Sequence, residues 1–279
     1  MTIINKINDI KIYLNEGGNK RKSIGFIPTM GALHAGHLSL IQQARKENDL
    51  VVVSIFVNPK QFNSLNDLKR YPQDIDRDKA FIGDTADVIF APDIEEMYPS
   101  GFGTNIHISP LAEIGEGAYR PGHFDGMATV VLKLFEIVRP TRAYFGKKDY
   151  QQYLIVKQMV RDVNLPIAIV GCETVREENG LAMSSRNMRL SDEGRKQAGM
   201  ISVALQDVTR LIFEGERDVN EVKKRMLHIL KRADIKVEYI EFRAISNFRE
   251  FGSIEESVVI LLAVYVEEVR LIDNIEVHL

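Results

Sequence analysis

The sequence is poor in the features that mark secreted, membrane-spanning and nucleic-acid-binding proteins. Cys172 is the only cysteine among 279 residues, so no intrachain disulfide can form, and a reducing compartment, the cytoplasm, is expected. Residues 1–15 carry charges every few positions and so lack the apolar core of a signal peptide, and the apolar run 258–266 is too short to cross a bilayer. The net charge of −3 lacks the basic excess that is usual for nucleic-acid binding. We therefore expect neither a membrane nor a nucleic acid as a partner.

What remains is the composition of an ordinary globular protein with alternating strand and helix patterns. Hydrophobic residues make up 45% of the chain and charged residues 27%. Residues 50–57 are almost wholly apolar and β-branched, as in a strand that is buried on both faces of a parallel sheet. Strand patterns occupy residues 23–29, 50–57, 87–90, 143–145 and 167–170, and helical patterns occupy residues 37–46, 125–138 and 150–162. This alternation predicts an α/β fold with a doubly wound, Rossmann-like parallel sheet over residues 1–175.

A smaller domain is expected after this sheet. The composition turns polar after Gly171, and residues 176–184 are interpreted as the junction. Ser191 then precedes two acidic residues, which is typical of a helix N-cap and first turn. Two helices, to about residue 213 and over 219–233, and three strands, 235–245, 258–266 and 270–277, predict a small α+β lid domain over residues 185–279.

The most informative segment is P-T-M-G-A-L-H-A-G-H, residues 28–37. An apolar strand ends there, a turn follows, and a helix is expected to begin near Gly36. Open α/β sheets bind ligands at such places, and a helix N-terminus attracts phosphate. His34 and His37 lie three residues apart, so both rings face one side and can donate to phosphate oxygens.

Other interpretations of these histidines stay open. They could simply cap a helix in a surface turn. A zinc site is disfavoured, because the metalloprotease pattern has its histidines four residues apart with a glutamate between them.

Two further polar segments fit a nucleotide site. In G-K-K-D, residues 146–149, Lys148 could neutralise triphosphate charge and Asp149 could accept a hydrogen bond from a ribose hydroxyl; the alternative is an exposed polar turn. In M-S-S-R, residues 183–186, two hydroxyls and the Arg186 guanidinium suit an anion clamp; the alternative is a serine-rich linker. A hinge that carries phosphate ligands would couple domain closure to catalysis.

Six motifs together resemble those of the pantothenate synthetase family, in its order and spacing. They are G-F-I-P-T-M-G-A-L-H-A-G-H-L-S-L (25–40), V-S-I-F-V-N-P-K-Q-F (53–62), R-Y-P (70–72), R-P-G-H-F-D-G (120–126), F-G-K-K-D-Y-Q-Q (145–152) and G-L-A-M-S-S-R-N (180–187). Residues 271–274, L-I-D-N, are also similar, whereas the rest of the second domain is only weakly diagnostic.

The resemblance implies an ATP-dependent ligase of the H-x-G-H nucleotidyltransferase group. Pantoate would attack the α-phosphate of ATP to give pantoyl-adenylate and pyrophosphate, and β-alanine would then displace AMP to form pantothenate. It also implies Mg²⁺ and a homodimer through the first domain. Two alternatives remain: a transferase that adenylates a phosphate ester at the same H-x-G-H site, and a nucleotide-binding regulatory subunit.

The resemblance assigns the site residues as follows. Those expected to be catalytic are His34, His37, Lys148 and Arg186; those expected to bind ATP are Met30, Gly31, His34, Gly36, His37, Gly146, Lys148, Asp149, Val175, Met183, Ser184, Ser185 and Arg186; those expected to bind pantoate or β-alanine are Asn58, Gln61, Arg120, His123 and Gln152.

Metal binding by the protein should be limited, because Mg²⁺ is normally held by substrate phosphates with one or two carboxylates. Asp76 and Asp78 follow the R-Y-P motif, and Asp78 is the better match for a magnesium ligand. The alternative is a solvated helix face.

Overall fold

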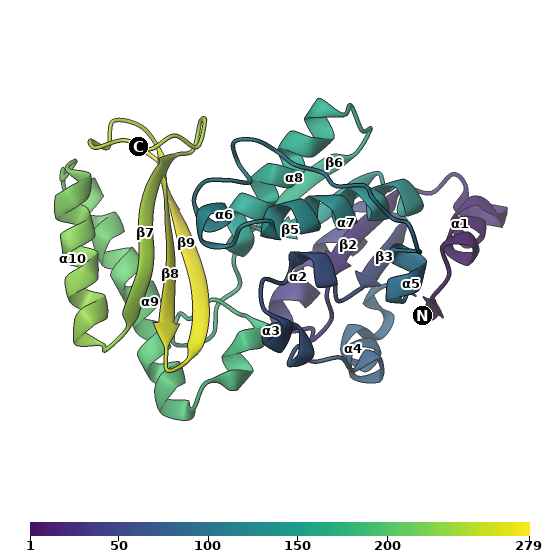
Figure 1. Cartoon of the computed structure of the whole chain (residues 1–279), viewed down its shortest axis with the longest axis horizontal. Helices are drawn as coiled ribbons and strands as arrows, with labels where there is room; N and C mark the ends of the chain where they lie inside the picture. Colours follow the sequence, from purple (N-terminus) through teal and green to yellow (C-terminus); the bar gives the residue numbers. More distant parts are fainter. The chain divides into compact units, whose positions relative to one another are not determined.

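The computed structural model describes residues 1–16 and 18–279, which divide into two compact units, Met1–Glu173 and Thr174–Leu279 (Figure 1). Residues 176–184, expected to form a junction, belong instead to the second unit, where Arg176 and Ala182 pair in an antiparallel bridge. No helix in the described part of the chain is long and apolar enough to span a membrane.

The first unit is a six-stranded parallel sheet in the order β1-β4-β3-β2-β5-β6. Its strands are β1 (Thr2–Ile4), β2 (Ile24–Thr29), β3 (Leu50–Ile55), β4 (Val88–Phe90), β5 (Arg142–Gly146) and β6 (Ala168–Cys172). Its helices are α1 (Ile7–Asn15), α2 (Ala35–Glu47), α3 (Leu65–Lys69), α4 (Ile75–Ile82), α5 (Ile94–Met97), α6 (Glu116–Tyr119), α7 (His123–Val138) and α8 (Tyr150–Asp162). The predicted doubly wound α/β fold is confirmed.

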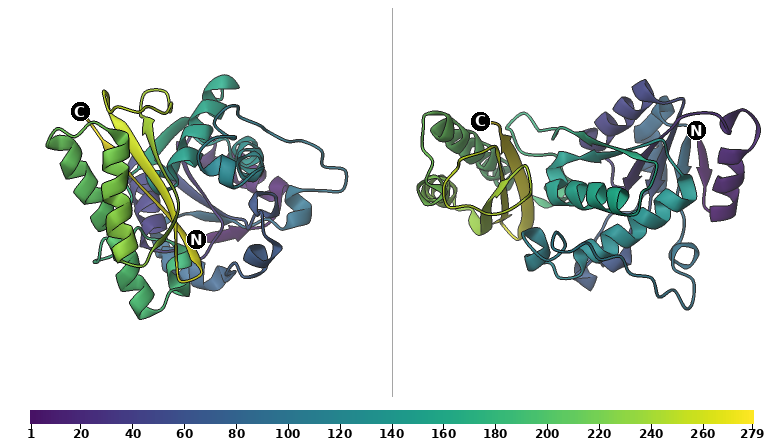
Figure 2. Two further views of the ribbon diagram at one scale, coloured as in Figure 1. Left: turned by 60° about the vertical axis from the view of Figure 1, so that its left-hand side comes forward. Right: turned by 90° about the horizontal axis from the view of Figure 1, so that it is seen from above.

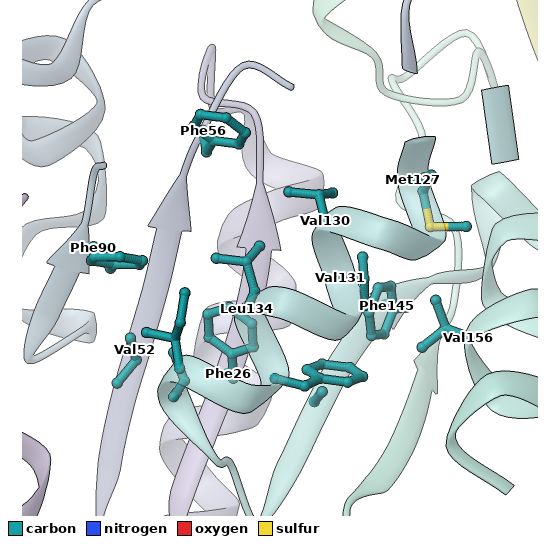
Figure 3. Packing of buried hydrophobic residues seen from close by; sticks show 14 of the residues in the cluster. Phe26, Val52, Phe56, Phe90, Met127, Val130, Val131, Leu134, Phe145 and Val156 are labelled. Atoms are coloured by element: carbon teal, nitrogen blue, oxygen red, sulfur yellow. The ribbon is translucent and has the colours of Figure 1, made fainter. Parts of the chain in front are cut away.

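Helices cover both faces of this sheet, as the apolar strands require. Alternate residues of a strand point to opposite faces, so Phe26 and Val52 pack against α1, α7 and α8, whereas Ile27 and Val53 pack against α2 and α4. Figure 3 shows the first of these cores, where Val130, Val131 and Leu134 of α7 lie over the sheet. β3 is buried through residues 50–54 for this reason.

The strand order places a topological switch between β2 and β5. Chain segments after β2 build the sheet toward β4, and segments after β5 build it toward β6. Ligands of open α/β sheets bind at the carboxyl ends of the strands that flank such a switch. The loops after Thr29 and after Gly146 are therefore the two that the fold brings together for a ligand.

The second unit is a three-stranded antiparallel sheet, β7 (Lys236–Ala244), β8 (Val258–Val266) and β9 (Val269–Val277), covered on one face by α9 (Asp192–Phe213) and α10 (Val219–Arg232), as Figure 2 also shows. The amphipathic helices bury Leu205 and Val208 of α9 and Met226 of α10 in the core that they share with the sheet. Ser191 is the N-cap of α9 as predicted, and its hydroxyl accepts from the Gly194 N–H at 3.0 Å.

Candidate active site

The turn after β2 has a tightly specified backbone. The Thr29 Oγ1 donates to the Ser54 carbonyl oxygen at 2.7 Å and accepts from the Gly31 N–H at 3.2 Å. Gly31 has φ +82° and Ala32 has φ +51°, in the left-handed region that favours glycine and is uncommon for alanine. Such a conformation is kept only where surrounding contacts enforce it.

Asp78 of α4 supplies those contacts. Its two carboxylate oxygens accept from the Ala32 N–H at 2.9 Å and from the Leu33 N–H at 2.8 Å, and the residue is 1% exposed. Burial raises the pKa of Asp78, although the two backbone donors oppose the shift. The magnesium ligation predicted for Asp78 is not favoured by this geometry, because both oxygens already hold the turn. Asp76, the other candidate, is exposed on the same helix.

His34 and His37 form a reciprocal cap at the start of α2. The Nδ1 of His34 accepts from the Gly36 N–H at 3.2 Å, and the Nδ1 of His37 accepts from the His34 N–H at 3.3 Å. The ring centroids are 4.0 Å apart. A backbone N–H can only donate, so in both neutral rings the proton must be on Nε2. Both histidines therefore have an Nε2–H donor that the cap does not use.

Both rings are held neutral. Burial, with smaller contributions that include the Lys148 charge, lowers the pKa of His34 to about 4, and burial, the neighbouring His34 and Lys148 lower that of His37 to about 3. The turn thus presents two neutral Nε2–H donors near a helix N-terminus, whose dipole favours an anion.

Lys148 brings the positive charge to this turn from the loop after β5. It lies in the 3-10 turn Lys147–Asp149, its side chain is 16% exposed, and its Nζ is 3.9 Å from the Asp149 Oδ2. Its charge lowers the pKa of both histidines, so Lys148 acts on the turn electrostatically. Gly146 ends β5, and a Cβ there would meet no heavy atom within 4 Å.

A cluster of buried amides adjoins the histidine turn. The Gln61 Nε2 is 3.0 Å from the Met30 Sδ, and the Gln61 Oε1 accepts from the Asn58 Nδ2 at 2.9 Å. Asn58 is 1% exposed and Gln61 is 8% exposed. The contact through Met30 joins these two predicted acid-binding residues to the predicted nucleotide-binding turn.

His123 and Arg120 contact the backbone carbonyl of Gln61. The His123 Nδ1 donates to the Gln61 carbonyl oxygen at 2.7 Å, and its Nε2 accepts from the Arg120 Nη1 at 3.1 Å. Because a guanidinium only donates, His123 has its proton on Nδ1, the opposite tautomer to His34 and His37. Burial and the Arg120 charge lower the pKa of His123 to about 4, against smaller opposing effects of the Gln61 carbonyl, Glu116 and Asp149. Arg120 also reaches the Glu116 carboxylate at 3.4 Å.

Gln152 lies half-buried in the first turn of α8. The preceding Gln151 is buried and has a structural role, because its side chain bonds the Glu116 N–H and the carbonyls of Leu111 and Ile114. Of this pair, Gln152 is therefore the glutamine that remains a candidate for binding a substrate.

The remaining predicted residues form a second group within the second unit. The Met183 N–H donates to the Val175 carbonyl oxygen at 2.9 Å. Ser184 caps the 3-10 helix Ser185–Arg189 by accepting from the Arg186 N–H at 3.2 Å. Thus Val175, Met183, Ser184, Ser185 and Arg186 belong to one local structure.

A buried ion pair anchors that local structure. Arg176, next to Val175, holds the Asp273 carboxylate with two hydrogen bonds of 2.7 and 3.0 Å, and the Asp273 side chain is 2% exposed. The Arg176 Nη1 also donates to the Gly180 carbonyl oxygen at 3.1 Å. Asp273 belongs to the L-I-D-N segment. Through Arg176, this segment anchors the residues that precede Ser184.

These groups suit phosphoryl chemistry better than chemistry at a resident metal. Within residues 1–16 and 18–279, no cluster of three His, Cys, Asp or Glu side chains could hold a metal ion. The histidine turn offers neutral donors and Lys148 a positive charge, which together suit a polyphosphate.

Comparison with known proteins agrees with this interpretation. A family model described as pantoate-beta-alanine ligase matches residues 2–276. A pantothenate synthetase of Caldicellulosiruptor bescii is 49% identical over 280 residues, which cover 100% of this chain and 99% of the relative. One of Aquifex aeolicus is 46% identical, and 99% of each chain is covered.

Solved structures agree as well. The pantothenate synthetase of Thermus thermophilus matches with a TM-score of 0.94 at 43% identity, with all of both chains covered. The pantoate-beta-alanine ligase of Francisella tularensis, complexed with beta-gamma ATP and beta-alanine, matches with a TM-score of 0.81 at 38% identity and covers 99% of this chain and 97% of that chain.

The role of Asp78 as an anchor can be tested with Asp78→Asn, which keeps the shape but replaces one acceptor with a donor. One backbone N–H of the turn then loses its partner, so we expect the free energy of unfolding to fall by about 1–3 kcal/mol. The KM for ATP should rise, and the Mg²⁺ concentration for half-maximal activity should not change. Asp76→Asn, on the exposed face of α4, is the matched control. A higher Mg²⁺ requirement at unaltered stability would instead make Asp78 a metal ligand.

Proposed function

The chain belongs to the pantoate-beta-alanine ligase family, and we propose that this ATP-dependent ligase activates pantoate as an acyl-adenylate at the turn that carries His34 and His37. β-Alanine then displaces AMP to give pantothenate. The observation that carries the proposal is the reciprocal histidine cap, which directs two neutral Nε2–H donors away from the backbone at the switch point of the sheet.

In the first step, a pantoate carboxylate oxygen attacks the α-phosphorus of ATP while the bond from that phosphorus to the bridging oxygen breaks. Pyrophosphate leaves with the bonding electrons. Negative charge grows on the equatorial oxygens during the attack, and the Nε2–H groups of His34 and His37 stabilise it together with Lys148. Donors that are fixed before the reaction need no reorganisation when the charge develops, so the cap itself contributes to catalysis.

The remaining residues divide between the two substrates. Met30, Gly31, Gly36 and Gly146 line the nucleotide beside the histidines, and Asp149 accepts from a ribose hydroxyl. Gln61 and Gln152 bind the pantoate oxygens, and Arg120 and His123 lie toward the acid or the incoming amine. Gln61 and Arg120 are linked by a hydrogen bond of 3.4 Å from the Arg120 Nη2 to the Gln61 carbonyl oxygen, which supports a common site.

Residues of the second unit complete the proposal. Ser184, Ser185 and Arg186, with Val175 and Met183, bind the nucleotide and its leaving pyrophosphate. A guanidinium and two hydroxyls are suitable donors for phosphate oxygens.

Magnesium enters with the nucleotide. The described residues offer no three-ligand cage, and the substrate phosphates can supply most of the oxygen ligands that Mg²⁺ needs. We therefore treat Mg²⁺–ATP as the substrate and assign no step to a protein-bound metal. The homodimer through the first domain and the cytoplasmic location stay predictions from the sequence.

The adenylate step can be tested by pyrophosphate exchange. With β-alanine absent, we expect labelled pyrophosphate to enter ATP only when pantoate is present, because the first step is reversible and needs the acid alone. Exchange that requires β-alanine would contradict a free-standing adenylate, and exchange supported by a different acid but not by pantoate would contradict the substrate.

His37→Ala tests the donors. We expect kcat for pantoate-dependent exchange to fall by about 10²-fold or more, as for loss of one transition-state donor, while thermal unfolding changes little. His107→Ala is the matched control, because His107 is an exposed histidine of the same unit that bonds Glu113 and Asp125 outside the site. Unchanged exchange in His37→Ala would refute the role of the cap in catalysis.

A further inference from the structure

The Asn58 side chain, predicted to bind pantoate, has no hydrogen-bonding capacity left for a ligand. A side-chain amide has two N–H donors and two oxygen lone pairs. The Nδ2 donates to the Gln61 Oε1 at 2.9 Å and to the Gly126 carbonyl oxygen at 3.0 Å. The Oδ1 accepts from the Lys60 N–H at 3.3 Å and from the Tyr98 hydroxyl at 2.8 Å. Asn58 is therefore a fixed connection between Tyr98 and Gln61.

The direction of each hydrogen bond in this chain is determined. The Lys60 N–H can only donate and the Gly126 carbonyl can only accept, so the Asn58 amide has one possible orientation. Its Nδ2 in turn requires the Gln61 oxygen to face it. The Gln61 Nε2 must then face the other way, toward Met30.

The Nε2 of Gln61 is the end that a substrate can use. Its neighbour, the Met30 Sδ at 3.0 Å, is a thioether and so a weak acceptor. A carboxylate or hydroxyl oxygen of pantoate would replace that contact with a stronger hydrogen bond. A Gln61 amide that was free to flip would present an oxygen instead, which repels a carboxylate.

Aromatic packing holds the Tyr98 side chain in position. The ring packs edge-on against Phe56 and Phe102, with centroids 5.9 and 5.0 Å away. Burial raises the pKa of Tyr98, so the hydroxyl keeps its proton and donates. α7 comes close enough to accept from Asn58 because Gly126 lacks a side chain: a Cβ there would lie 2.2 Å from the Lys60 carbonyl oxygen.

We propose that Tyr98 is a positioning residue that, through Asn58, fixes the Gln61 amide with its Nε2–H groups toward pantoate. The inference rests on the proposed role of Gln61 in pantoate binding. It makes Tyr98 a determinant of the affinity for the acid, although Tyr98 and Asn58 themselves do not contact it.

Tyr98→Phe removes the hydroxyl donor and keeps the ring. In pantoate-dependent pyrophosphate exchange, we expect the KM for pantoate to rise about 3- to 10-fold, as for loss of one buried hydrogen bond, with the KM for ATP unchanged. In a Gln61→Ala background, the same substitution should have no further effect on the KM for pantoate, because the group that it positions is gone.

Tyr144→Phe is the matched control. The Tyr144 hydroxyl is also buried and bonded, to Asn48 and Glu47 at 2.7 Å each, but these residues lie at the far end of α2 from the histidines. We expect a loss of thermal stability similar to that of Tyr98→Phe and an unaltered KM for pantoate.

Three results would overturn the proposal: an unchanged KM for pantoate in Tyr98→Phe, an equal rise in the KM for ATP, or an undiminished effect in the Gln61→Ala background. If Tyr98→Phe does not fold, Asn58→Asp gives the same test, because it keeps the shape and cannot donate to Gln61; an unchanged KM for pantoate there is equally decisive. Wild-type protein without pantoate-dependent exchange would refute the adenylate step instead.

Discussion

The reciprocal hydrogen bonds between His34 and His37 are the constraint on which the rest of the site depends. Each Nδ1 accepts a backbone N–H of the first helical turn, so helix capping and the ring tautomers have the same cause. The cap in turn needs the left-handed conformations of Gly31 and Ala32, which the Asp78 carboxylate holds. A residue on α4 thereby determines the direction of two donors at the start of α2.

Backbone groups also orient the polar side chains where the acid is expected to bind. Backbone groups fix the tautomer of His123 and the orientation of the Asn58 amide, as they do for the two capping histidines. The histidines stay neutral because burial lowers the pKa of each one. Positive charge is left to Lys148 and Arg120. The hydrogen-bond donors and acceptors are thus oriented before any substrate binds. Such preorganised groups stabilise a transition state in which charge develops.

Much of the fold could be predicted from the sequence, because a sheet buried on both faces requires apolar runs that local patterns reveal. α8 and β8 have the predicted ends, and α2 and α7 begin two residues before theirs. β1 gave no such signal, since it contributes three residues at the sheet edge. Asp78 and Tyr98 could not be assigned, because their partners lie 45 to 46 and 40 residues away and depend on how α4 and the segment after α5 pack. Both histidines do cap α2, and the cap leaves their Nε2 atoms unused.

The most direct test of the preset donors is isotope-edited NMR of the histidine rings during a pH titration. With both pKa values depressed to about 4 and 3, His34 and His37 should stay neutral with the proton on Nε2 from about pH 8 down to about pH 5, while His123 carries its proton on Nδ1. Titration of His34 or His37 near the ordinary histidine pKa, or a proton on either Nδ1, would contradict the claim that the cap prepares them as donors.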